Sequence, residues 1–176
     1  MIQHPKHIFE NHPIAIYVIC IHLIILTQLQ FTPWPELHLW PYLMDHGFQL
    51  YRDIAFEKPP LLPAFLWAWF KIWGNSLISL KFLTWIIVTA TDILFYFVAA
   101  RIFPKSRFIP ISLILYILLM TALGGNSLWF DLLIAPLFLI TYYLLSQKKF
   151  FSAGVVLGLA LLTKQLSLVA AVPVYF

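Results

Sequence analysis

Acidic and basic side chains gather between residues 34 and 63, in the stretch WPELHLWPYLMDHGFQLYRDIAFEKPPLLP. Glu36 stands there between a proline and a leucine, and Glu57-Lys58 directly precedes Pro59-Pro60. A carboxylate can take a proton from a hydroxyl, and a cationic side chain can stabilise a departing phosphate. The pattern therefore indicates a segment that could carry the acids and bases of an active site. A polar loop with ordinary solvated charges has the same composition, and both interpretations stay open at this point.

A short helix is predicted to position the first of these residues. Over residues 36–46 the apolar side chains of Leu37, Trp40 and Met44 share one helical face, which is typical of an amphipathic helix at a membrane surface. Gly47 is expected to end this helix, because glycine readily adopts the left-handed conformation found after helix C-termini.

The composition predicts a membrane protein. Of 176 residues, 62% are hydrophobic and only 10% are charged, with a mean hydropathy of +0.89. Soluble domains carry roughly 25% charged residues, so a soluble enzyme is excluded. The single Cys20 excludes a disulfide-stapled module. The net charge of +4 is scattered along the chain, so no nucleic-acid partner is expected.

Long uncharged runs predict an all-α, polytopic transmembrane bundle of about five spans, with an outer first loop that carries an interfacial helix. The expected spans are residues 13–31, 82–100, 108–130, 132–147 and 150 onward. We expect a single domain, with residues 1–31 as the first span, 32–81 as the outer catalytic loop and 82–176 as further spans. The chain ends within an apolar run at residues 173–176, so we expect it to be the N-terminal part of a longer domain.

The orientation depends on residues 60–73, which begin with Pro60 and contain Lys71. If this segment stays at the outer surface, six basic residues lie inside and five outside, in accord with the positive-inside rule; if it crosses, four lie inside and seven outside. We therefore expect an inside N-terminus and a segment that does not cross. The inside set is then Lys6, Arg101, Lys105, Arg107, Lys148 and Lys149, and the outer face holds Glu36, Asp53, Glu57, Lys58, Asp131 and Lys164.

Two steps of the loop resemble a known family. Residues 47–53, GFQLYRD, and residues 58–61, KPPL, are similar to the first outer loop of GT-C-type integral membrane glycosyltransferases, which include the protein O-mannosyltransferases and the lipid A aminoarabinose transferases. Asp131, residues 154–160 (GVVLGLA) and residues 162–164 (LTK) follow in the same order as in that family. Those enzymes usually open the loop with an acidic pair or an Asp farther before the glycine; here the candidate is Glu36.

The resemblance implies sugar transfer from a polyprenyl-phosphate donor to a lipid, glycan or protein acceptor, in a multi-pass protein of the prokaryotic plasma membrane whose active site faces outward. Glu36 is the expected general base, and Asp53 and Asp131 are further candidate catalytic carboxylates. Lys58 and Lys164, with Arg52, are expected to bind the donor phosphate. Glu57 is a candidate ligand for a divalent metal, and whether a metal is needed stays open. Ion pairs Arg52–Asp53 and Glu57–Lys58 are the structural alternative.

A non-catalytic membrane protein, either a transporter subunit or an inactive relative, is the alternative function. A transporter places polar residues along its spans, whereas here Asp92 is the deep charge and the others crowd the loops. For Asp92 we predict an internal hydrogen bond, with Thr89 and Thr91 as nearby hydroxyls.

Overall fold

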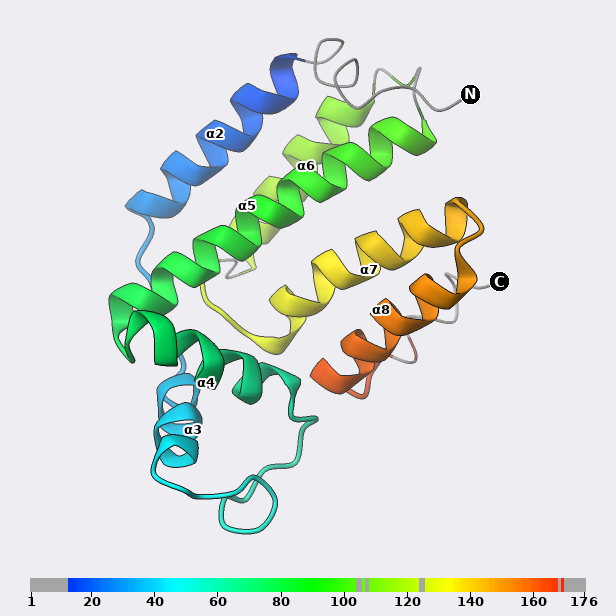
Figure 1. Ribbon diagram of the computed structural model, residues 1–176. Coiled ribbons are helices and arrows are strands. Elements are labelled where there is room, and N and C mark those ends of the chain that lie inside the picture. The colour runs from blue at the N-terminus through cyan, green and yellow to red at the C-terminus, as the bar shows by residue number, and fades with distance from the viewer. Residues whose placement is uncertain (1–12, 104–105, 107, 124–125, 168, 170–176) are drawn as a thin grey trace.

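The computed structural model describes residues 13–103, 106, 108–123, 126–167 and 169, which form seven helices (Figure 1). The predicted all-α fold is confirmed, since this part of the chain contains no β-strand. The helices are α2 (Pro13–Gln28), α3 (Glu36–Asp45), α4 (Leu61–Trp73), α5 (Leu77–Ile102), α6 (Ile109–Ala122), α7 (Phe130–Ser146) and α8 (Phe150–Thr163).

The helices α2, α5, α6, α7 and α8 run side by side, and α3 and α4 lie across one end of them (Figure 1). The helices α2, α5 and α6 pack on one another, and α7 packs between α5 and α8. The helices α3 and α4 pack together where α2 ends and where α5 and α7 begin (Figure 1). We call this the α3–α4 end. Because consecutive long helices alternate in direction, α8 also finishes there, so segments far apart in sequence meet at this end.

One helix among the described residues, α5, is long and apolar enough to cross a membrane by length and composition. A single such helix is weak evidence for a membrane protein, because a buried core helix of a soluble protein passes the same test. The expected span 13–31 is shorter, since α2 ends at Gln28. The expected span 108–130 is also too long, because α6 ends at Ala122 and Phe130 already begins α7.

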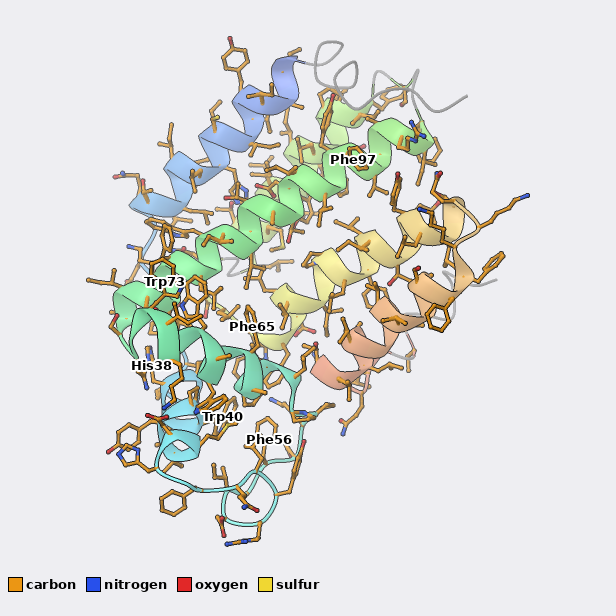
Figure 2. All side chains as sticks on the ribbon, in the orientation of Figure 1. His38, Trp40, Phe56, Phe65, Trp73 and Phe97 are labelled. Carbon is orange, nitrogen blue, oxygen red and sulfur yellow. The ribbon has the colours of Figure 1, made fainter. Side chains whose placement is uncertain are left out.

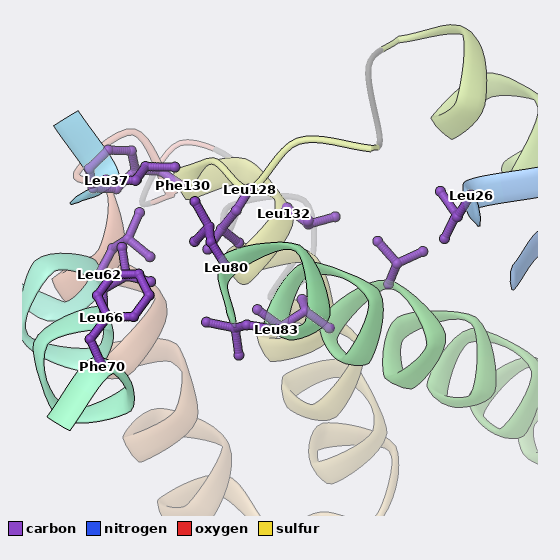
Figure 3. Close-up of a cluster of buried hydrophobic side chains, with 12 residues drawn as sticks. Leu26, Leu37, Leu62, Leu66, Phe70, Leu80, Leu83, Leu128, Phe130 and Leu132 are labelled. Atoms are coloured by element: carbon purple, nitrogen blue, oxygen red, sulfur yellow. The ribbon is translucent and has the colours of Figure 1, made fainter. Parts of the chain in front are cut away.

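Two apolar clusters hold the arrangement together. The larger one joins α3 and α4 to the starts of α5 and α7 through Leu37, Leu62, Leu66, Leu80 and Phe130, all fully buried (Figure 3). Burial of one such side chain is worth about 1.5–3 kcal/mol, so this contact fixes the α3–α4 end. The second cluster joins α2, α5 and α6 and includes Ala15, Ile19, Tyr96, Ala100, Ile109, Leu113 and Ile117.

Local signals set the helix ends near the loop. Gly47 follows α3 with φ of +88° and Gly74 follows α4 with φ of +80°, a region that favours glycine, so the predicted end of the first helix is confirmed. The hydroxyl of Ser76 accepts a hydrogen bond from the backbone N–H of Ser79 at 3.2 Å and caps α5.

The two ends of the bundle carry different residues. Arg101 closes α5, and Lys148 and Lys149 join α7 to α8, all at the end opposite to α3 and α4 (Figure 1). The loop with Lys58 and the end of α8 with Lys164 lie at the α3–α4 end. Three residues of the expected inside set (Lys6, Lys105 and Arg107) and the apolar ending at residues 173–176 lie outside the described residues.

Candidate active site

An aromatic surface supports Lys58 at the α3–α4 end. The ammonium nitrogen lies 4.4 Å from the centre of the Trp129 ring and 4.7 Å from that of Phe130. Such cation–π contacts hold an ammonium group without neutralising its charge. No carboxylate of the described residues pairs with Lys58, so the Glu57–Lys58 ion pair named as the structural alternative is not formed. The positive charge is therefore available to an anion.

Asp131 and Lys164 form an ion pair beside this surface. The Lys164 Nζ donates to Asp131 Oδ1 at 2.6 Å, although the two residues are 33 positions apart. Asp131 lies in the first turn of α7, and Lys164 directly follows the last turn of α8, so each charge opposes the partial charge of its own helix end. Next to Lys164, the Gln165 side chain donates to the Glu57 carbonyl at 3.4 Å and ties this corner to the loop.

Glu36 begins α3 and is half-buried. One of its carboxylate oxygens, Oε2, is shielded from solvent and has no hydrogen-bond partner. Two residues earlier, the Trp34 ring packs 4.9 Å from Trp129, the ring that also supports Lys58. The same indole therefore links the start of α3 to the lysine, and Glu36 keeps a lone pair that no protein donor occupies.

A segment between α6 and α7 produces this convergence. The Asn126 amide donates to the carbonyls of Leu29 and Gln30 at 3.0 and 3.2 Å, and its oxygen accepts from Trp85 at 3.2 Å. The Ser127 hydroxyl donates to the Thr32 carbonyl at 2.7 Å. These bonds hold residues 126–129 against the chain that leads into α3. The sequence analysis missed both this anchor and the aromatic surface of Trp129 and Phe130. The signal that could have found them is the pair of polar residues Asn126-Ser127 and the pair of aromatic residues Trp129-Phe130, which closely precede Asp131.

Arg52 and Asp53 pair with each other at the turn of the loop. Asp53 Oδ1 accepts from Arg52 Nε at 3.0 Å, and Oδ2 accepts from the Gln49 backbone N–H at 2.9 Å. Neither side chain forms a hydrogen bond or ion pair with Lys58, Asp131 or Lys164. The ion pair between Arg52 and Asp53, which the sequence analysis named as the structural alternative to a catalytic role, is therefore present.

Tyr51 positions the backbone of Lys58. Its hydroxyl donates to the Lys58 carbonyl at 2.8 Å, and its own backbone has φ of +70°, a strained value for a bulky residue. Desolvation raises the pKa of the Tyr51 hydroxyl above its ordinary value of 10.0, so the group stays protonated and remains a donor at neutral pH. The strain is held in place by this bond and by the contact between Leu50 and Ile54.

Two pockets flank the aromatic surface. One, of about 390 Å³, is lined by Trp40, Ala55, Phe56, Glu57 and Lys58, and its two aromatic rings meet edge to face at 4.8 Å (Figure 2). The other, of about 280 Å³, is mainly apolar and is lined by Met120, Leu123, Ser127, Trp129, Asp131, Leu132 and Ala135. Trp129 and Asp131 line the second pocket, and Lys58 of the first pocket rests on the Trp129 ring, so the charged pocket and the apolar pocket adjoin the same indole.

The carboxylates do not assemble a metal site. Within the described part of the chain, no group of three or more His, Cys, Asp or Glu side chains could hold a metal ion. Glu57 is exposed, and its backbone carbonyl accepts a hydrogen bond from Gln165. The described residues therefore do not supply the ligand set of a resident divalent metal.

Asp45 pairs with Lys71 and thereby links α3 to α4. We expect a direct measurement of its pKa, by NMR of the Asp45 carboxyl carbon, to give a value below the ordinary 3.8, because Lys71 donates a hydrogen bond to the carboxylate. The ion pair is then fully present above about pH 4 and is lost as the pH falls through the lowered pKa. Lys71→Met should return the value to its ordinary range; an unchanged value would contradict the pairing.

Comparison of the chain with known protein families, with characterised proteins and with solved structures found no match in any of the three.

Proposed function

We propose that the protein is a membrane glycosyltransferase that moves a sugar from a polyprenyl-phosphate donor to an acceptor at the outer membrane surface. One observation carries the proposal: Lys58, held on an aromatic surface without a carboxylate partner among the described residues, lies at the same end of the bundle as the Asp131–Lys164 pair and as Glu36 at the start of α3. These residues come from four separate segments of the chain, and a polar loop with independent solvated charges does not require them to meet.

A membrane setting is supported by the outer surface of the bundle. Large apolar side chains are exposed along α2, α6 and α8, far beyond what a soluble monomer presents. The exposed ones on α6, for example, are Ile111, Ile114, Leu115, Leu118 and Leu119. In our proposal α2, α5, α6, α7 and α8 are the five spans, and α3 and α4 lie at the interface. Since α2, α6 and α8 alone reach only roughly 21–24 Å, the flanking residues complete their crossings.

The proposed chemistry assigns a task to each side chain. Lys58 binds the donor phosphate, because an ammonium ion next to a phosphate stabilises the charge that develops as the sugar–phosphate bond breaks. The apolar pocket beside Leu132 and Met120 suits the isoprenoid chain, and Asp131, which is paired with Lys164, lines this pocket. Glu36 takes the proton of the acceptor hydroxyl as that oxygen attacks the sugar carbon, and the phosphate leaves with the electron pair of the broken bond.

The direct test is sugar transfer by the purified full-length protein in liposomes that contain a radiolabelled polyprenyl-phosphate sugar. Transfer to an added acceptor, or to water as hydrolysis, would support the proposal. A parallel binding assay with the unsugared polyprenyl phosphate separates donor recognition from chemistry. The proposal would be contradicted if the protein neither bound polyprenyl phosphate nor transferred sugar from any donor tested.

The proposed topology makes a separate prediction. In a Cys20→Ala background, we expect a cysteine at position 127 to react with an impermeant maleimide added outside cells, and a cysteine at position 106 to react only after permeabilisation. Ser127 lies at the α3–α4 end, and Ser106 lies beyond α5 at the opposite end. Outside labelling of position 106 would place the Arg101 end on the wrong side and contradict the orientation.

A second candidate function is a transporter subunit. It is favoured by the buried polar pair of Asp92 and His22 in the middle of the helices. The sequence analysis identified only Asp92 as a polar residue at this depth. Ionisable residues inside membrane spans often mark proton or ion pathways. Donor binding without transfer, combined with proton-dependent uptake in liposomes, would favour this function over glycosyl transfer.

A further inference from the structure

His22 and Asp92 form a buried pair between α2 and α5. His22 Nδ1 lies 2.7 Å from Asp92 Oδ2, and each residue is only 1% exposed. The predicted internal hydrogen bond of Asp92 is thus made by His22; of the two threonines named as nearby hydroxyls, Thr91 is engaged elsewhere, because its hydroxyl donates to the Ile87 carbonyl at 2.7 Å. The pair lies about 15 Å along α5 from Ile102 and roughly 22 Å from Leu77, well inside the bundle.

Each partner keeps a polar atom without a hydrogen bond. His22 Nε2 and Asp92 Oδ1 are both shielded from solvent and unpaired, and so is the hydroxyl of Tyr116 on α6. Tyr116 lies close enough to Asp92 for an electrostatic interaction, and its ring stacks on Phe95 at 5.1 Å. Buried polar atoms in native proteins are almost always satisfied, so these three atoms mark a place where charge and protons are not balanced by fixed protein partners.

The proton count of the pair decides its charge. When both ring nitrogens of His22 carry a proton, the positive imidazolium and the negative Asp92 carboxylate give the pair no net charge. When that proton passes to water, neutral His22 still donates from Nδ1 to Asp92, but the site then carries one uncompensated negative charge among apolar side chains. An unpaired buried charge is far more costly than a paired one.

We propose that His22 and Asp92 form a proton-binding site that holds α2 against α5 while the pair is neutral and loosens α2 when the proton leaves. Proton release is favoured as the pH rises, so α2 packs more weakly in alkaline solution than at mildly acidic pH. The site is separate from Lys58 and Glu36 at the α3–α4 end, and it does not depend on the proposed sugar transfer.

The other ionisable groups on the packed helices do not neutralise this site. Tyr17 and Cys20 are exposed on α2, Asp131 is occupied by Lys164, and Lys81 and Arg101 are separated from Asp92 by roughly 16 and 13 Å of helix. The remaining ionisable groups on these helices are tyrosines, whose phenol groups carry no positive charge in either protonation state: Tyr96 on α5, Tyr116 on α6, and Tyr142 and Tyr143 on α7.

The test uses Cys20, the single cysteine of the sequence, which is exposed two residues before His22. A nitroxide spin label on Cys20 of the full chain in detergent reports α2 mobility by electron paramagnetic resonance at about pH 6 and about pH 9. We expect the mobile fraction to at least double at the higher pH in the parent protein, and to stay constant in Asp92→Asn. Asp45→Asn, which removes a surface carboxylate paired with Lys71, should retain the parent response.

A second variant keeps the test decisive if Asp92→Asn fails to fold. The double substitution His22→Leu with Asp92→Leu replaces the pair by apolar side chains, a change that buried ion pairs often tolerate. We expect this protein to hold α2 in place at both pH values. Equal spectra of the parent protein at the two pH values, or a pH response that persists in either variant of the pair, would overturn the proposal.

Discussion

Glu36→Gln is expected to lower the turnover of sugar transfer by about 100- to 10,000-fold, the usual contribution of general base catalysis. Glutamine keeps the shape of the side chain but cannot accept the proton. The structure supports this choice of carboxylate because Glu36 Oε2 is buried without a partner, whereas Asp53 and Asp131 both accept hydrogen bonds from cations. Glu36→Asp shortens the reach by one methylene and should leave partial activity. The measurement is kcat for transfer from a polyprenyl-phosphate donor in liposomes.

Asp45→Asn is the matched control for this substitution. Asp45 ends the helix that Glu36 begins, and it is already paired with Lys71. Its replacement should leave turnover within about 2-fold, since an exposed ion pair contributes little and Asp45 is not part of the proposed site. Near-normal turnover in Glu36→Gln together with a large loss in Asp45→Asn would show that the assignment of the general base to Glu36 is wrong. If both variants were active, Asp53 and Asp131 would be the next candidates.

Lys58→Met should lower kcat/KM for the donor by about 10- to 100-fold, since a hydrogen bond to a charged group contributes about 1.5–3 kcal/mol. Methionine retains an apolar stem over Trp129 and Phe130, so the aromatic surface stays covered and the loss reports the charge. Lys58→Ala, which also uncovers the rings, should be at least as severe. Donor affinity, measured by titration with polyprenyl phosphate, should fall in parallel.

Lys71→Met provides the comparison for Lys58. Lys71 also approaches an aromatic ring, at 5.8 Å from Trp67, and lies on the neighbouring helix, but its charge is paired with Asp45. It should therefore change kcat/KM little. Equal losses at both lysines would mean that the donor responds to the overall positive charge of this end, and the assignment of the phosphate to Lys58 would be wrong.

The sequence alone determined the helical class and most helix positions. Apolar runs with few charges predicted helices at α2, α5, α7 and α8, and the 3.6-residue spacing of Leu37, Trp40 and Met44 predicted α3. Gly47 was correctly expected to end it, because its allowed conformations are a property of the residue itself. Boundaries failed where tertiary contacts intervened: residues 126–129 were predicted to be apolar helix, yet Asn126 and Ser127 hydrogen-bond to residues 29–32 and the segment before α7 is not helical.

Only the tertiary structure decided which charged residues meet. Sequence spacing could not distinguish Lys58, which rests on Trp129 and Phe130, from Arg52, which pairs with its neighbour Asp53, because both are basic residues of the same loop. Likewise Asp92 showed a deep charge, but its partner His22 lies 70 residues away. Local propensity is carried by neighbouring residues, whereas such pairs depend on how whole helices pack, and that packing brought Lys58, Asp131 and Lys164 to one end and His22 to Asp92.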